Sequence, residues 1–189
     1  MSRISLRLLC MLFMYLLCCQ PSLSCAEDAK ITNFIITNTP EHLIIYCGVT
    51  NYFTKKMEDA IMAGIPTTFT FYVELRRERH YWFDKKITSL KIKHTIKYDT
   101  IKKIFYVIHN GNTKEPEQFG DFNGAKRAMS DLNGFIVSSM KELEKGKNYY
   151  VRVKAELDKV RLPLHMEYVF FFVSLWDFET DWYREDFIY

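Results

Sequence analysis

Hydrophobic and polar residues alternate with a period of two along most of the chain. From Phe69 to Leu75 every second residue is apolar, and the residues between them are threonine, tyrosine or glutamate. Similar alternation recurs over 41–50, 88–99 and 149–157. This pattern is typical of antiparallel sheets with one solvent-facing side. It predicts a mainly β (α+β) fold, an antiparallel β-sandwich or a barrel-like sheet. The four predicted apolar faces are Leu43, Ile45, Cys47 and Val49; Phe69, Phe71, Val73 and Leu75; Leu90, Ile92, Ile96 and Tyr98; and Tyr149, Val151, Val153, Ala155 and Leu157.

Two short helices are predicted between these strands. Thr54 is placed to cap "KKMEDAIMA", and Gly64 before Ile65-Pro66 would end that helix. Asp121 is placed to cap "FNGAKRAMSDL", and Asn133-Gly134 would end the second helix. Side chains of threonine and aspartate satisfy free backbone amides at helix starts, whereas glycine favours helix ends.

Turns and the C-terminal region complete the pattern. Turns are predicted at Asn110-Gly111, at Asp99-Thr100 and at Lys145-Gly146. Val169–Trp176 is apolar on both faces, so it is either a buried strand or a short buried helix. The closing "DWYREDFIY" is predicted to return as a final strand.

The first 26 residues have the features of a secretory signal peptide. Arg3 and Arg7 precede an uninterrupted apolar run, Leu8–Cys19, which is too short to cross a bilayer comfortably. Small residues at Ser24 and Ala26 would allow cleavage before residue 27. We therefore expect export to the periplasm or cell envelope, with 27–189 forming a single β-rich domain. The alternatives are an uncleaved anchor and a lipoprotein modified at Cys25.

The charge balance and the cysteine count narrow the set of possible functions and bonds. Without the two leader arginines, 24 basic residues stand against 23 acidic residues, which gives no support for nucleic-acid binding. Four of the five cysteines lie in the leader, so Cys47 alone would remain and no internal disulfide can form.

Several blocks of the chain resemble a bacterial family of exported proteins, domain of unknown function 4390. They are "GIPTTFTFYVELRRERHYWFDKKI", "HTIKYDTIKKIFYV", "AKRAMSDLNG" and "FFVSLWDFETDWYREDF". The family has no established activity, so the resemblance carries over no catalytic residue. It implies an N-terminal signal, one envelope domain and a proteobacterial source. It also implies a link, through neighbouring genes, to a two-component sensor system.

The stretch "ELRRERHYWFD" is the candidate binding surface. In the plain interpretation, alternating charges from Glu74 to Glu78 form cross-strand pairs, and Trp82 and Phe83 cap the sheet. In the functional interpretation, arginine and aromatic side chains form a recognition patch, because such residues dominate interface energies. The candidate residues are Arg76, Arg77, Arg79, Tyr81 and Trp82.

Histidines and cysteine offer little chemistry at the sequence level. The five histidines have no metal-binding spacing, so no metal and no cofactor is expected. His94 lies on a predicted apolar face, where a hydrogen-bonded core histidine is favoured over a nucleophilic pair with Cys47.

An acidic site near the C-terminus is the weaker alternative. In an extended segment Asp177, Glu179 and Asp181 would share one face at steps of about 7 Å. Such spacing could serve glycosidic acid–base chemistry or bind calcium, but solvated carboxylates are more common.

These observations favour a non-enzymatic binding or adaptor domain with an unidentified envelope protein or envelope component as its partner. The alternatives are an envelope hydrolase that uses Asp177, Glu179 and Asp181, and a carrier of an apolar ligand.

Overall fold

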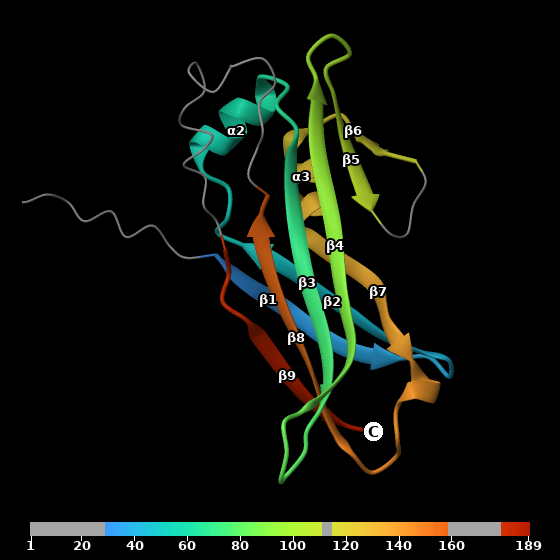
Figure 1. Ribbon diagram of the computed structural model, residues 1–189. Helices are drawn as coiled ribbons and strands as arrows, with labels where there is room; N and C mark the ends of the chain where they lie inside the picture. The colour runs from blue at the N-terminus through green and yellow to red at the C-terminus, as the bar shows by residue number, and fades with distance from the viewer. Residues whose placement is uncertain (1–28, 111–114, 159–178) are drawn as a thin grey trace, which may run out of the picture.

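The computed structural model describes residues 29–110, 115–158 and 179–189, which form two open antiparallel sheets and two short helices (Figure 1). The three-stranded sheet has the order β1-β2-β7, and the six-stranded sheet has the order β6-β5-β4-β3-β8-β9. The elements are β1 (Lys30–Asn38), β2 (His42–Thr50), α2 (Lys55–Met62), β3 (Thr67–Arg77), β4 (Lys85–Asp99), β5 (Ile104–Asn110), β6 (Glu117–Phe119), α3 (Phe122–Ser130), β7 (Asp131–Ser139), a 3-10 turn (Met140–Glu142), β8 (Asn148–Leu157) and β9 (Tyr183–Ile188). The predicted mainly β fold is confirmed, and it contains no closed barrel among these residues.

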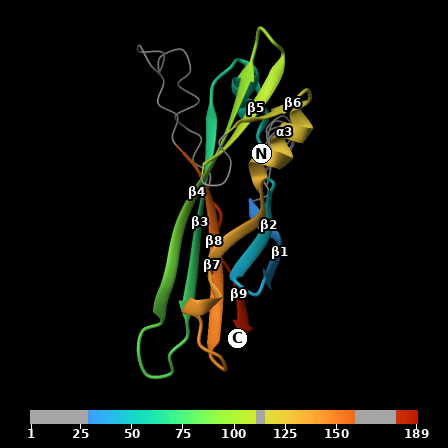
Figure 2. The same cartoon turned by 90° about the vertical axis from the view of Figure 1, so that its right-hand side faces the viewer.

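The core lies between the two sheets. The strands of the smaller sheet cross obliquely over the larger sheet in Figure 1, and Figure 2 shows the two layers from the side. Alternation places one side of each strand in this core, as the sequence predicts for β2, β3, β4 and β8. Phe69, Phe71, Val73 and Leu75 of β3 have no exposed area, and β3 pairs with β4 on one side and β8 on the other. Burial of these large side chains is the main source of stability for such a sheet.

Both predicted helix starts are confirmed. The Thr54 hydroxyl accepts a hydrogen bond from the Met57 amide, and the Asp121 carboxylate accepts one from the Gly124 amide at 2.8 Å. Met57 and Ile61 face the core, as their spacing predicts. Gly64, at φ 87°, follows the first helix where a glycine end is expected.

The predicted end of the second helix is wrong. The helix ends at Ser130 and the chain continues directly into β7, so Asn133-Gly134 lies inside a strand. Between the pairs Ile45–Phe135 and Cys47–Leu132 the strand β7 contains one more residue than β2. Gly134 adopts φ 68° at this irregularity, which only glycine tolerates readily. The Asn-Gly signal therefore marks a bulge and not a helix end.

Turn predictions are confirmed where the structure describes them. The Asp99 carboxylate accepts hydrogen bonds from the Ile101 and Lys102 amides and closes the β4–β5 turn. Gly146, at φ 70°, lies in the turn before β8. Strands β5 and β6 pair antiparallel, while 111–114 lie outside the described residues.

The C-terminal prediction is confirmed in part. β9 is the predicted final strand, and it pairs antiparallel with β8. The segment Val169–Trp176 and the proposed leader lie outside the described residues. Within the described part of the chain, no helix has the length and apolar character needed to span a membrane.

Candidate functional site

The loop that joins β3 to β4 carries three consecutive exposed aromatic residues. Tyr81 is 95% exposed, Trp82 is 74% exposed and Phe83 is 89% exposed. The prediction that Trp82 and Phe83 cap the sheet is therefore wrong. The reason is that these rings lie beyond Leu75, the last buried residue of β3, and before Ile87, the first residue of β4 that packs against the core. We call residues 79–86 the hairpin tip.

Contacts with neighbouring strands fix the base of the hairpin tip. The Asp84 carboxylate accepts a hydrogen bond from the Tyr150 hydroxyl at 2.9 Å and one from the Arg79 amide at 3.2 Å. Burial, together with the bond to Asp84, raises the pKa of Tyr150, so its hydroxyl remains a donor. The Glu78 amide donates to the Asn148 carbonyl at 3.0 Å. The aromatic residues thus project from a loop whose two ends are held by hydrogen bonds.

The cations of the hairpin tip have no internal counterion. Arg79, Lys85 and Lys86 are exposed, and none forms an ion pair with a carboxylate of residues 29–110, 115–158 or 179–189. Three cations and one carboxylate, Asp84, therefore lie around the exposed rings.

The arginines on the outer face of β3, β8 and β9 are, in contrast, paired. Arg76 and Arg152 both donate to the same oxygen of Glu74, each at 2.9 Å through Nε. Burial raises the pKa of Glu74, but hydrogen bonds from Arg152 and Arg76 outweigh it and leave the pKa below its usual value. The Arg152 guanidinium also lies 4.3 Å from the Trp182 ring centre. These guanidinium groups therefore already have a carboxylate partner within the sheet.

Arg184 of β9 completes this paired face. It forms ion pairs with Glu78 and Asp186, and its guanidinium lies 3.7 Å above the Tyr150 ring. Arg184 and the Asp84–Tyr150 hydrogen bond therefore hold the same end of the sheet.

The five residues predicted as one binding surface fall into three places. Arg76 belongs to the paired outer face, whereas Arg77 lies one residue further on and pairs with Glu144. Only Arg79, Tyr81 and Trp82 share the hairpin tip. The sequence pattern identified the loop but could not separate its free residues from the paired ones.

The acidic alternative is described for two of its three residues. Asp177 lies outside the described residues. Glu179 and Asp181 are exposed on either side of buried Thr180, which is the alternation expected of an extended segment. Glu179 pairs with Lys154, and the Thr180 hydroxyl accepts a hydrogen bond from the Ala155 amide at 3.0 Å.

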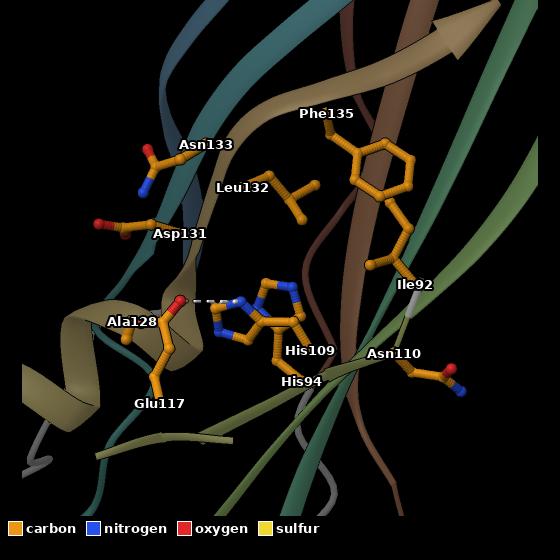
Figure 3. Close-up of a pocket in the computed structure, with 10 residues that line it drawn as sticks. All are labelled: Ile92, His94, His109, Asn110, Glu117, Ala128, Asp131, Leu132, Asn133 and Phe135. Atoms are coloured by element: carbon orange, nitrogen blue, oxygen red, sulfur yellow. Dashed lines mark ion pairs between the residues drawn. The ribbon is translucent and has the colours of Figure 1, made fainter. Parts of the chain in front are cut away.

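A pocket that the sequence interpretation missed lies beside β4, β5 and β7 (Figure 3). Its volume is about 250 Å³, and its lining includes two stacked imidazoles, His94 and His109, with ring centres 4.2 Å apart. The other lining residues are Ile92, Asn110, Glu117, Ala128, Asp131, Leu132, Asn133 and Phe135. His94 and His109 are direct partners in the β4–β5 pairing. Counting the register outward from the predicted Asp99 turn would therefore have predicted that these two side chains are neighbours.

His94 is the hydrogen-bonded core histidine that the sequence predicts. It is 4% exposed, and its Nδ1 lies 3.0 Å from the Met129 carbonyl oxygen. Because a carbonyl only accepts, Nδ1 must carry the hydrogen and Nε2 keeps its lone pair in the neutral ring. Burial first, and the neighbouring His109 second, lower the pKa of His94 to about 4.

His109 presents a nitrogen to this pocket without a partner among the described residues. Its Nε2 is buried and makes no hydrogen bond within the described part of the chain, while Nδ1 lies 3.8 Å from a Glu117 oxygen. Across the described segments, no group of three or more histidine, cysteine or acidic side chains has a metal-binding arrangement.

Cys47 is buried, as expected of a packing residue. Burial, and then the nearby Asp131 carboxylate, raise the pKa of its thiol to about 12. A nucleophilic cysteine requires a lowered pKa, so this environment opposes a Cys47–His94 pair.

A family model described as Domain of unknown function (DUF4390) matches residues 26–186. The chain belongs to this family. The resemblance found in the sequence is thereby confirmed. No curated protein and no solved structure matches the chain. Membership in the DUF4390 family assigns no activity, so the function must be argued from the residues themselves.

Proposed function

We propose that this DUF4390 protein is an exported, non-enzymatic binding domain that docks on a component of the bacterial cell envelope through its hairpin tip. The observation that carries the proposal is the run Tyr81, Trp82 and Phe83, all largely exposed on a braced loop. Large aromatic side chains in water forgo a substantial burial energy, and contiguous exposed apolar groups mark interaction sites.

The distribution of arginines supports the same conclusion. Arg76, Arg152 and Arg184 already have carboxylate partners, whereas Arg79 at the hairpin tip has none among the described residues. A binding partner can therefore gain more binding free energy from contacts with the hairpin tip than from contacts with the paired arginines. Truncating a well-buried interface anchor such as Trp82 typically costs about 2 kcal/mol, which weakens binding roughly thirtyfold.

The surroundings of the carboxylates favour binding over hydrolysis. A glycosidic general acid needs an environment that keeps its carboxyl group protonated. Glu179 and Asp181 are instead exposed, and Glu179 has a lysine partner. The carrier hypothesis finds little support in the histidine pocket, because many of its lining residues are polar or charged.

Site-specific photo-crosslinking in cells tests the proposal. A photoreactive phenylalanine replaces Tyr81, and a matched variant carries it at Ile101, which is 90% exposed in the β4–β5 turn. These two turns lie at opposite ends of β4 (Figure 1). We expect adducts with envelope components from position 81, few from position 101, and a loss of the position-81 adducts when Trp82→Ala is added. Equal crosslinking at both positions, or adducts that persist in Trp82→Ala, would contradict the proposal.

A further inference from the structure

The hairpin tip combines exposed aromatic rings with unpaired cations. The exposed rings are Tyr81, Trp82 and Phe83. Arg79 stands two positions before the first ring, and Lys85 and Lys86 follow the last ring after one residue. Tyrosine and tryptophan concentrate at lipid–water interfaces, because each ring has an apolar body and a polar edge. Lysine and arginine can lay their apolar stems beside such rings while the charge reaches lipid phosphates. We infer that the hairpin tip inserts its aromatic side chains into the interface of a membrane that contains anionic lipids. This inference rests on the proposed function and names the component that is bound.

The charge of the hairpin tip favours an anionic surface. The two carboxylates in this region are held by other partners, since Glu78 pairs with Arg184 and Asp84 accepts from Tyr150. Glu78 is neutralised by Arg184, whereas Asp84 keeps its charge and offsets one of the three cations Arg79, Lys85 and Lys86, so the hairpin tip retains an excess of positive charge. Each basic residue near an anionic leaflet strengthens binding about fivefold. Low salt should strengthen the effect, because exposed charges are screened over about 10 Å at 0.1 M.

The shape of the hairpin suits insertion. Between Leu75, the last buried residue of β3, and Ile87 of β4, no residue of the hairpin packs against the core. The loop lies at one end of the long sheet in both Figure 1 and Figure 2. It can therefore enter a headgroup region while the core stays in water. The Asp84 and Glu78 contacts keep the backbone at its base in place.

A lipid surface fits this small, narrow feature better than a protein does. Three aromatic side chains offer roughly 450–750 Å² when fully buried. A standard protein interface takes about 800 Å² from each partner, so a protein would also have to contact the residues that flank the rings and surround them with water-excluding contacts. A bilayer interface needs no such contacts, because it closes around whatever is inserted.

Vesicle binding by the protein recovered from cells tests the inference. We use phosphatidylcholine vesicles with and without about one third phosphatidylglycerol, and measure co-sedimentation. The protein should bind the anionic vesicles, and a triple change of Tyr81, Trp82 and Phe83 to serine should lower the partition coefficient at least about tenfold. Lys85→Glu with Lys86→Glu should remove the preference for anionic lipid. Ile101→Ser, at an exposed apolar residue of the opposite turn, should leave binding unchanged.

Tryptophan quenching shows whether the ring enters the bilayer. Vesicles with brominated acyl chains should quench part of the fluorescence of the bound protein. Trp82→Phe keeps an aromatic ring at the hairpin tip, so it should retain binding and lose most of that quenching.

Two outcomes separate the inference from the proposed function. If the triple variant binds vesicles as the parent protein does, or if nothing binds, the membrane inference is overturned. Should position 81 still crosslink to an envelope protein in that case, the binding function stands and the partner is a protein. If both position-81 crosslinking and vesicle binding fail, both proposals are overturned together.

Discussion

Acidification should destabilise the protein through His94. This imidazole is almost fully buried. Its Nδ1 donates a hydrogen bond to the Met129 carbonyl, and one face of its ring stacks on the ring of His109. Burial and the neighbouring ring lower the pKa of His94 from 6.5 to about 4 in the folded state. In the unfolded chain the same side chain would take up a proton near its ordinary pKa of about 6.5.

The direction and size of the effect follow from proton linkage. Below pH 6.5 the unfolded state binds a proton that the folded state does not, so the free energy of unfolding falls as the pH falls. The loss is complete once the pH is below about 4, and it amounts to about 3 kcal/mol at about 1.4 kcal/mol per pKa unit. Between pH 7.5 and pH 5 the expected loss is about 2 kcal/mol. Above pH 7 this residue contributes no pH dependence.

Comparison with His94→Phe isolates the contribution of His94 to the pH dependence of the free energy of unfolding. Phenylalanine fills the site but cannot titrate or donate to Met129, so we expect a loss of about 1–3 kcal/mol at pH 7.5. At pH 5 the parent protein has lost about 2 kcal/mol through His94, and the difference between the two proteins should shrink by that amount. Urea unfolding followed by circular dichroism at both pH values gives the four free energies. His80→Gln is the matched control, because His80 is exposed in the hairpin tip. An unchanged difference between the parent and His94→Phe at pH 7.5 and pH 5, or an NMR titration of His94 near 6.5, would refute the reasoning.

Three further predictions concern single positions. The Cys47 thiol should react with an alkylating reagent at pH 8 only after urea unfolding, and Cys47→Ser should fold with a modest loss of stability; rapid labelling of the native protein would contradict its burial. Asp121→Ala removes the acceptor for the Gly124 amide and should cost about 1 kcal/mol in urea unfolding, whereas Asp121→Asn should recover most of it. N-terminal sequencing of the exported protein should begin at Glu27, and an intact leader or a lipid on Cys25 would overturn the predicted processing.

Local patterns predicted much of the fold because their causes are local. Alternation identifies the buried face of a strand, since successive side chains point to opposite sides of a sheet. The burial of Phe69, Phe71, Val73 and Leu75 follows this rule. Thr70, on the opposite face, is also buried, and its hydroxyl donates a hydrogen bond to Asp158. Thr54 and Asp121 cap helices through the next few amides, so their roles can also be recognised from short segments.

The failures arise where strand pairing decides the outcome. Asn133-Gly134 has the composition of a helix end, yet its pairing against β2 makes it a bulge. His94 and His109 lie 15 positions apart in the sequence, and only the β4–β5 register stacks their rings. The exposure of Trp82 depends on how far the hairpin extends beyond the core, which alternation alone does not specify.

The structure also changes which residue tests binding most cleanly. From the sequence, Arg76 is the better probe, because it lies on a polar face while Trp82 risks being part of the core. In the structure Arg76 shares one Glu74 oxygen with Arg152, so Arg76→Ala disturbs a paired, half-buried carboxylate as well as any surface. Trp82 lies beyond the last buried residue of β3 and has no such role. Exposed positions of this kind usually change stability by no more than about 0.5 kcal/mol. A binding defect in Trp82→Ala can therefore be attributed to the lost contact, whereas one in Arg76→Ala would also report the loss of the Glu74 pair.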